Sequence, residues 1–281
     1  MRRGATPRVR RRLDAELVRR DLASDRRRAR ELIEAGRVTV GGAPAPKPSR
    51  MVAPGEAIEV AAPPPRFVSR GGDKLDAALE AFDIPVAGTR ALDVGASTGG
   101  FTDCLLQRGA AAVVALDVGR NQLHERLRRD PRVEDRPRTN IRHVGPGELG
   151  PPFDVVVADL SFISITLVID RLLGLTAPGG HLVLLVKPQF EAGRAEATRG
   201  RGVIRDPAVW RRVLEEVTGA CGARGAAIMG VMVSPLTGAD GNAEFLLHAR
   251  RPPAPGGRPV DLDAVVADAL ALVGGRGAGP G

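Results

Sequence analysis

The stretch that decides the fold reads ALDVGASTGGFT and spans residues 91–102. It begins as a short, apolar, β-rich run and continues into a glycine-rich loop that opens a helix. Glycines let the backbone pass close beneath a ligand at the carboxyl end of the first strand, where open α/β sheets bind nucleotides. Residues 91–102 therefore predict an α/β sheet with a nucleotide-like ligand at its carboxyl edge.

The spacing within this loop narrows the class of ligand. A dinucleotide-binding loop would read G-x-G-x-x-G, but Ser97 stands at the position of the second glycine, which disfavours a dehydrogenase. The next β-rich run ends in Asp117, 24 residues after Asp93. An acid at that place can accept both ribose hydroxyls of an adenosine. Together, the loop and Asp117 indicate an adenosine-containing ligand.

Beyond the loop, apolar β-rich runs alternate with helical stretches, which is typical of a parallel sheet with crossover helices. The runs expected as strands are residues 91–94, 112–117, 155–159, 182–186, 228–233 and 245–249. We expect residues 251–281 to form a C-terminal linker, a short helix and a tail that is disordered from residue 274. The side of this helix expected to pack on the domain carries Leu262, Val265, Val266, Ala269, Leu270 and Val273.

Positive charge is concentrated at the N-terminus. Residues 1–50 carry 15 Lys and Arg against 6 Asp and Glu, whereas the rest of the chain carries 26 against 27. Such a short cationic module is expected to dock on nucleic acid, the alternative being a solvated arginine face in an arginine-rich protein. The cationic side chains expected to bind RNA are Arg19, Arg20, Arg26, Arg27, Arg28, Arg30, Arg37 and Lys47.

The N-terminal segment has its own pattern of elements. Residues 1–12 are basic and lack periodicity, so we expect a flexible tail. Helical spacing begins at Leu13, and a second helix follows with Ser24 as its N-cap. Strand-like pieces at residues 37–40, 50–52 and 57–60 complete a two-helix unit over residues 13–61, followed by a Pro-rich linker at 62–66.

This N-terminal arrangement resembles the small RNA-binding module first seen in ribosomal protein S-four. The resemblance implies docking on folded RNA. Aromatic residues make up 3% of the chain and tyrosine is absent, so base stacking is poorly supplied. Recognition of RNA backbone and shape fits the composition better.

Lysine is rare, which draws attention to its positions. Only Lys47, Lys74 and Lys187 occur among 41 basic residues. A guanidinium keeps its proton, whereas a buried ammonium can lose one, so Lys74 and Lys187 are candidates for chemistry. Asp159 and Lys187 each end a predicted strand, and we expect both to face the ligand crevice.

Five motifs in order are similar to those of the TlyA family, which joins an S-four-like module to an FtsJ-like ribose 2'-O-methyltransferase domain. They read SRGGDKL at 69–75, DVGASTGGFT at 93–102, ADLSFIS at 158–164, VKPQFE at 186–191 and GNAEF at 241–245. The resemblance implies an α/β, class I (Rossmann-like) methyltransferase domain over residues 67–250, with a small α+β RNA-binding domain before it. It further implies S-adenosylmethionine as cofactor and ribosomal RNA or a ribosomal subunit as partner, with a cytidine of small- or large-subunit rRNA, or of both, as the target.

The same resemblance assigns roles to residues. Lys74, Asp159, Lys187 and Glu244 match the Lys-Asp-Lys-Glu catalytic tetrad, with Lys187 as base, Lys74 lowering the pKa of Lys187, and the two acids orienting the lysines. One departure is Arg120, which stands where the family often carries an aromatic residue. The cofactor-binding residues implied are Asp93, Gly95, Ser97, Thr98, Gly99, Gly100, Phe101, Asp117, Asn140 and Asp159.

Other classes of protein are disfavoured. The two cysteines and four histidines are scattered, so we expect neither a disulfide scaffold nor a metal site, and the expected compartment is the cytoplasm. The longest apolar run, residues 110–116, is far shorter than the roughly 20 residues of a membrane span. A non-catalytic RNA-binding protein is disfavoured by the complete tetrad. A membrane-active, haemolysin-like protein is disfavoured by N-terminal helices without Trp or Phe on an apolar face.

Overall fold

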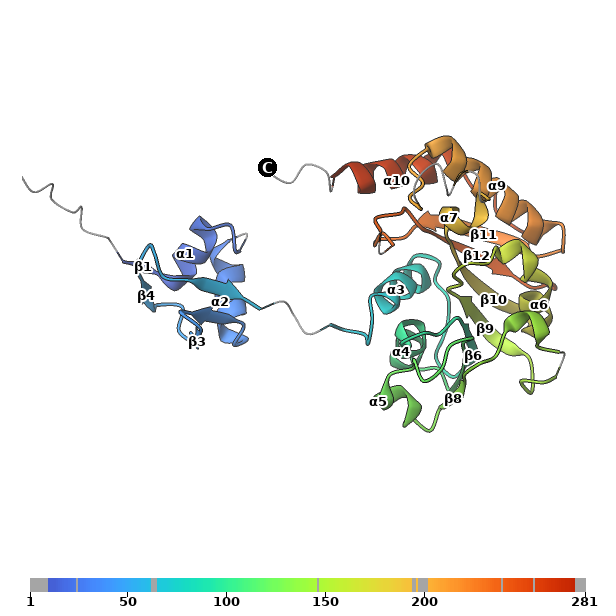
Figure 1. Cartoon of the computed structure of the whole chain (residues 1–281), viewed down its shortest axis with the longest axis horizontal. Coiled ribbons are helices and arrows are strands. Elements are labelled where there is room, and N and C mark those ends of the chain that lie inside the picture. The colour runs from blue at the N-terminus through green and yellow to red at the C-terminus, as the bar shows by residue number, and fades with distance from the viewer. Residues whose placement is uncertain are drawn as a thin grey trace, which may run out of the picture. The chain divides into compact units, whose positions relative to one another are not determined.

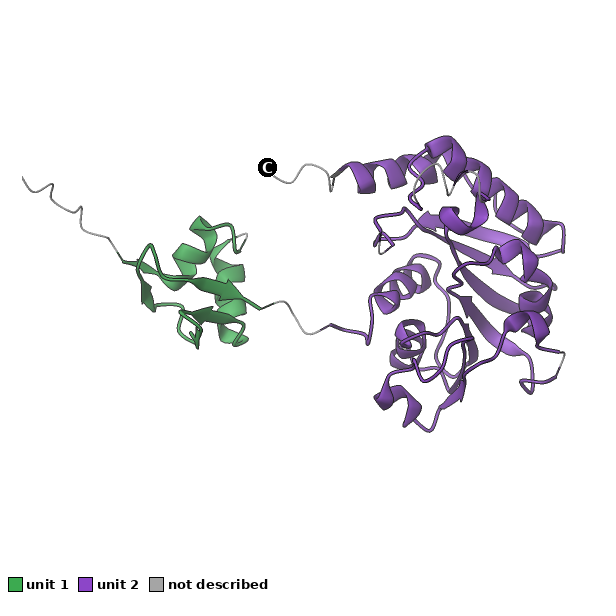
Figure 2. Ribbon diagram, in the orientation of Figure 1, with its two compact units in different colours: residues 1–64 green, residues 65–281 purple. Residues whose placement is uncertain are grey.

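The computed structural model describes residues 10–23, 25–61, 65–145, 147–193, 196, 202–238, 240–254 and 256–275. The chain forms two compact units, residues 1–64 and residues 65–281 (Figure 2). Each unit has hydrophobic clusters of its own.

Unit 1 combines two helices with short strands (Figure 1). The helices are α1 (Leu13–Arg19) and α2 (Arg26–Glu34), and the strands are β1 (Arg11–Arg12), β2 (Val38–Val40), β3 (Ala43–Pro44), β4 (Met51–Val52) and β5 (Ile58–Val60). Strand β1 pairs with β4, while β3, β2 and β5 form a three-stranded sheet. Leu13, Leu17 and Ile33 are fully buried, so the helices cover the strands through the apolar positions that the sequence spacing indicates.

Two expectations for unit 1 are wrong. Arg11 and Arg12 pair with Val52 and Met51, so an ordered strand begins within the segment expected to be a flexible tail, of which residues 1–9 lie outside the described part. Helix α2 is capped by Asp25, whose carboxylate accepts a hydrogen bond from the Arg28 backbone nitrogen at 2.9 Å. Ser24, the expected cap, lies outside the described residues.

Unit 2 is built on a seven-stranded sheet. Its strands, in spatial order, are β11 (Ala227–Val233), β12 (Phe245–Arg250), β10 (Thr176–Val186), β9 (Phe153–Ala158), β6 (Arg90–Val94), β7 (Ala112–Leu116) and β8 (Val133–Arg136). The neighbours from β10 to β8 pair in parallel, and β12 is antiparallel to both β10 and β11. Strand β8 was not expected, because its sequence VEDR lies at the sheet edge with alternating exposure and contains no apolar run.

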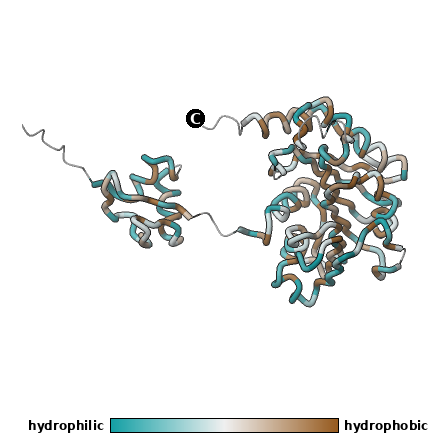
Figure 3. Tube along the Cα trace, in the orientation of Figure 1, coloured by the Kyte–Doolittle hydropathy of each residue, from teal (hydrophilic) through white to brown (hydrophobic). Residues whose placement is uncertain are grey.

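Helices cover both faces of this sheet. They are α3 (Gly71–Ala81), α4 (Gly100–Gln107), α5 (Glu125–Arg128), α6 (Ile169–Leu175), α7 (Pro188–Glu191), α9 (Pro207–Gly222) and α10 (Leu262–Gly275), with 3₁₀ turns η1 (Ile141–His143) and η2 (Ile165–Leu167). Val155 and Val157 pack in the cluster of α3 and α4, whereas Val156 and Ala158 pack in the cluster of α6, α9 and α10. Since alternate residues face opposite sides, the central strands are mostly apolar, as Figure 3 shows.

The C-terminal helix extends further than expected. Gly274 and Gly275 belong to α10, so disorder from residue 274 is wrong for these two, and residues 276–281 lie outside the described part. Val265, Val266 and Ala269 are buried. Leu270 is exposed, because it lies outside the face of the helix that these three residues pack against the domain. Among the residues that the structure describes, no helix is both long and apolar enough to cross a membrane.

A glycine brings the ends of β6 and β9 together. The Asp159 backbone nitrogen donates to the Val94 carbonyl at 3.0 Å. Gly95 has a φ of +87°, and a Cβ there would overlap the Asp159 carbonyl oxygen. The loop after β6 can therefore lie against Asp159 only with a glycine at this position.

We predict that Gly95→Ala destabilises unit 2 more than Gly88→Ala. Gly88 also has a left-handed φ, +76°, but its Cβ would meet nothing within 4 Å, so this control isolates backbone strain of about 1–2 kcal/mol. Overlap with Asp159 should add about 1–3 kcal/mol. Denaturant unfolding of the full chain measures both losses, and equal losses would contradict the argument.

Candidate active site

The acid after β7 holds the glycine-rich loop in place. Asp117 accepts a hydrogen bond from the Ser97 backbone nitrogen at 2.8 Å and another from the Gly119 nitrogen at 2.6 Å. Each carboxylate oxygen can accept more than one hydrogen bond, so Asp117 keeps capacity for a ligand hydroxyl. Ser97 itself has a φ of +48°, a conformation uncommon outside glycine.

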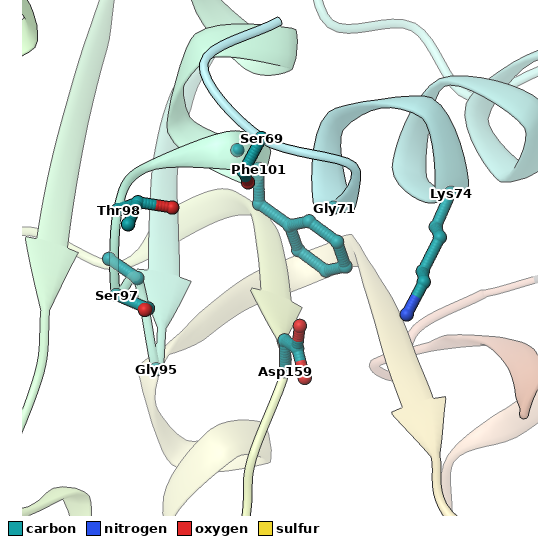
Figure 4. A pocket seen from close by; sticks show the side chains of 10 residues that line it. Ser69, Gly71, Lys74, Gly95, Ser97, Thr98, Phe101 and Asp159 are labelled. Carbon is teal, nitrogen blue, oxygen red and sulfur yellow. The ribbon is translucent and has the colours of Figure 1, made fainter. Parts of the chain in front are cut away.

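A pocket lies between this loop, the start of α3 and the end of β9. Its lining residues are Ser69, Gly71, Lys74, Gly95, Ala96, Ser97, Thr98, Gly100, Phe101 and Asp159. Figure 4 shows the Lys74 ammonium and the Asp159 carboxylate reaching into it from different elements. Most of the cofactor-binding residues expected from the sequence therefore meet in one place, together with a member of the tetrad.

Four expected cofactor residues are not among those that line this pocket: Asp93, Gly99, Asp117 and Asn140. Gly99 is the N-cap residue of α4, with a φ of +95°. The Asn140 side-chain oxygen accepts a hydrogen bond from the Arg142 backbone nitrogen at 3.0 Å and caps η1. The structure thus gives Asn140 a local role, and its adenine contact stays a prediction.

Asp93 is fully buried beneath the loop. Thr102 Oγ1 donates to its Oδ2 at 2.7 Å, while Oδ1 has no hydrogen-bond partner among the described residues. Burial away from water raises the pKa of Asp93 to about 7, an effect that the Thr102 bond opposes and the nearby charge of Asp159 reinforces. Asp93 is therefore an unusual carboxyl group, poised to change charge near neutral pH.

The tetrad residues form two ion pairs. Lys74 Nζ on α3 lies 2.5 Å from Glu244 Oε2, with both side chains at least nine-tenths buried. Lys187 Nζ lies 2.5 Å from Asp159 Oδ1 and donates to Ser161 Oγ at 3.1 Å. One member of each pair, Lys74 or Asp159, lines the pocket, whereas their partners Glu244 and Lys187 are not among its lining residues.

Sheet topology brings these residues to one edge. Asp159 and Lys187 follow the parallel neighbours β9 and β10, whose carboxyl ends lie side by side. Strand β12 runs antiparallel to β10 and starts with Phe245 opposite Val186, so the preceding Glu244 arrives at the same edge. Chain segments about 170 residues apart thereby come into contact.

Sequence reasoning missed the loop residues Ser161 and Phe162. Phe162 is 90% exposed and has a φ of +64°. Its ring centroid lies 5.0 Å from that of Phe190, whose ring lies 5.9 Å from Lys187 Nζ. An exposed aromatic ring beside the tetrad is a surface on which a base can stack. The signal that could have found them is that both residues share the motif ADLSF with Asp159.

Most of the expected RNA-binding arginines contact acids within unit 1. Arg26 and Arg30 both pair with the buried carboxylate of Asp14, and Arg19 and Arg20 pair with that of Glu16. Burial opposes the charge of Asp14, but its arginine partners hold the pKa of this carboxyl at about 2. Hydrogen bonds from the arginines likewise lower the pKa of Glu16 to about 2. These arginines are therefore held in place before any RNA binds.

The remaining cations differ in what they contact. Arg20 also donates to the Glu56 and Pro54 carbonyls, Arg37 donates to the Ala61 carbonyl, and Arg28 pairs with Glu31. Arg27 and Lys47 are exposed and form no ion pair or side-chain hydrogen bond with the residues that the structure describes. Arg20 and Arg37 are thus tied to the main chain, whereas Arg27 and Lys47 are free to meet a ligand.

Known families and proteins match this architecture. The model of the FtsJ-like methyltransferase family matches residues 67–251, and that of the S4 domain matches residues 11–58. The 16S/23S rRNA (cytidine-2'-O)-methyltransferase TlyA of Mycobacterium tuberculosis is 50% identical over 240 residues, which cover 85% of this chain and 89% of that protein. This chain belongs to the TlyA family.

Two solved structures are similar to this chain. A hemolysin-named protein from Streptococcus thermophilus is 36% identical, with a TM-score of 0.73, and the match covers 96% of this chain and 99% of that one. Another from Lactococcus lactis is 39% identical, with a TM-score of 0.70, over 72% of this chain and 98% of that one. The predicted combination of a class I methyltransferase fold with an N-terminal RNA-binding domain is confirmed.

We predict that Asp93→Asn changes the pH dependence of stability. The pKa of Asp93 is about 7 in the folded protein and 3.8 without the fold, so as pH rises between these values the unfolded state ionises first and wild type loses stability. Asparagine does not titrate. The Tm of the variant minus that of wild type should therefore rise by several degrees from pH 5 to pH 8.

The control for this prediction is Asp130→Asn. A hydrogen bond from Arg132 lowers the pKa of Asp130, so ionisation there stabilises the fold and its loss should not raise Tm at pH 8. A Tm difference for Asp93→Asn that stays constant from pH 5 to pH 8 would contradict the prediction.

Proposed function

We propose that this protein is an S-adenosylmethionine-dependent ribose 2'-O-methyltransferase that acts on a cytidine of ribosomal RNA in the cytoplasm. The observation that carries the proposal is that Lys74 and Asp159, each ion-paired to another residue of the tetrad, line one pocket beside the glycine-rich loop. The activity printed for the Mycobacterium tuberculosis relative supports the same reaction and the same class of target.

The residues at the pocket suit S-adenosylmethionine. The Asp159 carboxylate offers an acceptor for the amino group of the cofactor, Ser97 and Thr98 offer polar contacts, and the Asp117 carboxylate offers acceptors for ribose hydroxyls. Phe101 adds an apolar wall. When bound, the cofactor supplies a methyl group that its positively charged sulfur has already activated.

What the protein must provide is a base and a fixed geometry. A ribose 2'-hydroxyl is a poor nucleophile until it loses its proton. Lys187, in its uncharged amine form, is the residue proposed to take that proton, and the Asp159 carboxylate would compensate the charge that it gains. The contacts with Asp159 and Ser161 fix where its nitrogen lies. Lys74, anchored by Glu244, is proposed to position the hydroxyl.

The proposed reaction is tested with purified protein, labelled S-adenosylmethionine and ribosomal subunits. Nucleoside mass spectrometry should find 2'-O-methylcytidine, with one subunit or both as substrate. A methyl group on a base would overturn the ribose assignment. Isothermal titration of S-adenosylmethionine without detectable binding would instead favour a non-catalytic RNA-binding protein.

Replacing Lys187 tests its role directly. Lys187→Ala and Lys187→Arg should each lower kcat at least ~100-fold, because the first lacks a base and the second keeps its proton. Affinity for S-adenosylmethionine, measured by isothermal titration, should change less than about threefold. Lys187→Arg is the sharper variant because the positive charge persists, and turnover retained in it would refute the role of base.

RNA docking by unit 1 should depend in part on Arg27 and Lys47, which form no ion pair or side-chain hydrogen bond with the described residues. The Arg27→Ala/Lys47→Ala double variant should reduce the salt dependence of rRNA affinity by about one to two counterions, without lowering Tm. Arg20→Ala should instead lower Tm, because its guanidinium is bound to carbonyls and to Glu16. Filter binding across salt concentrations measures the first effect, and an unchanged slope would place docking elsewhere.

A further inference from the structure

Several successive contacts join the loop that follows β9 to the loop that follows β10. We call this arrangement the loop clasp, made of residues 159–165 and residues 187–191. Lys187 contacts Asp159 and Ser161, and the Phe190 ring contacts the Phe162 ring. At the far end of the loop clasp, Glu191 contacts Ser164 and Ile165. Lys187, Phe190 and Glu191 thus contact residues that lie successively further along the loop from β9.

Glu191 uses both of its carboxylate oxygens in the loop clasp. Oε1 accepts from the Ile165 backbone nitrogen at 2.9 Å, and Oε2 accepts from Ser164 Oγ at 2.5 Å. Ser164 Oγ in turn accepts from the Thr166 backbone nitrogen at 3.1 Å and caps η2. One side chain on α7 therefore fixes where the loop from β9 ends and η2 begins.

The loop that Glu191 holds contains strained backbone. Phe162 has a φ of +64°, an uncommon conformation for a bulky residue, and its ring is 90% exposed. Strain of this kind persists only where surrounding contacts hold it. The loop is secured at one end by the Asp159–Lys187 pair and at the other end by Glu191.

We infer that Glu191 is a positioning residue for methyl transfer, which holds the loop from β9 so that Asp159 and Ser161 keep Lys187 Nζ in its place. Glu191 does not line the pocket and is not one of the four tetrad residues. The inference rests on the proposed function, because the position of Lys187 Nζ affects turnover only if Lys187 is the base. A displacement of about 1 Å at reacting groups can lower a rate about 100-fold.

If Glu191 had a purely structural role, its replacement would lower the amount of folded protein. If it has a positioning role, its replacement lowers turnover in protein that is folded and binds the cofactor. Glutamine separates charge from geometry, because its oxygen can accept from Ile165 and its amide can donate to Ser164 Oγ. Burial raises the pKa of Glu191, so a neutral group of the same shape is expected to be tolerated.

The experiment compares Glu191→Ala, Glu191→Gln and Ser164→Ala with wild type on ribosomal subunits, with kcat expressed per S-adenosylmethionine site counted by isothermal titration. Glu191→Ala should lower kcat about 10- to 100-fold, with KM for the cofactor within about twofold of wild type. Glu191→Gln should keep kcat within about threefold. The Ser164→Ala/Glu191→Ala double variant should be no slower than Glu191→Ala, since both act through one contact.

The matched control is Glu148→Ala. Glu148 also accepts a backbone hydrogen bond, from Gly145 at 2.9 Å, in a different part of unit 2. This variant should keep the kcat of wild type. A Glu191→Ala variant whose kcat per cofactor site lies within twofold of wild type would overturn the inference, as would a Glu191→Gln variant as slow as Glu191→Ala.

Amide hydrogen exchange separates failure of this inference from failure of the proposed function. The Ile165 amide should exchange faster in Glu191→Ala than in wild type, with Glu191→Gln protected, and unchanged protection would refute the loop clasp. Wild-type protein that transfers no methyl group to any ribosomal RNA would instead refute the proposed function, whatever the exchange shows.

Discussion

Two largely buried lysine side chains beside the glycine-rich loop are tolerated because each contacts a carboxylate. Removing a charge from water costs several kcal/mol unless an opposite charge compensates it. Lys74 pairs with Glu244 and Lys187 pairs with Asp159, so the charge of each lysine is compensated. Such pairs fix where the nitrogens lie, which is what proton removal from a ribose hydroxyl requires.

That requirement constrains the surrounding fold. The four residues of the two pairs come from α3, from the ends of β9 and β10, and from the segment before β12. Because β9 and β10 are parallel neighbours and β12 is antiparallel to β10, these segments lie at one edge of the sheet. Close contacts at two glycines also help to place these residues. Gly95 lets the loop lie against Asp159, and a Cβ at Gly100 would overlap Ser69, so small residues set the start of α3, and with it Lys74, beside the glycine-rich loop.

Unit 1 applies the same electrostatic principle to a different task. The buried carboxylates of Asp14 and Glu16 gather arginines whose side chains are mostly about half exposed. Their lowered pKa values mean that these carboxyls stay ionised over the whole physiological range. The exposed N–H groups of these arginines are therefore presented in fixed directions, which suits the recognition of RNA backbone and shape.

Local sequence patterns predicted the class of fold, the position of the glycine-rich loop and the four residues of the candidate tetrad, because these rest on apolar runs, glycine spacing and short motifs. They did not reveal β8, whose edge position needs no apolar run, nor the capping of α2 by Asp25. The three-dimensional structure was needed to show which lysine pairs with which acid, which arginines donate to carbonyls, and that Glu191 contacts Ser164. These contacts join residues distant in the chain, and their partners depend on strand order and loop geometry that no local pattern specifies.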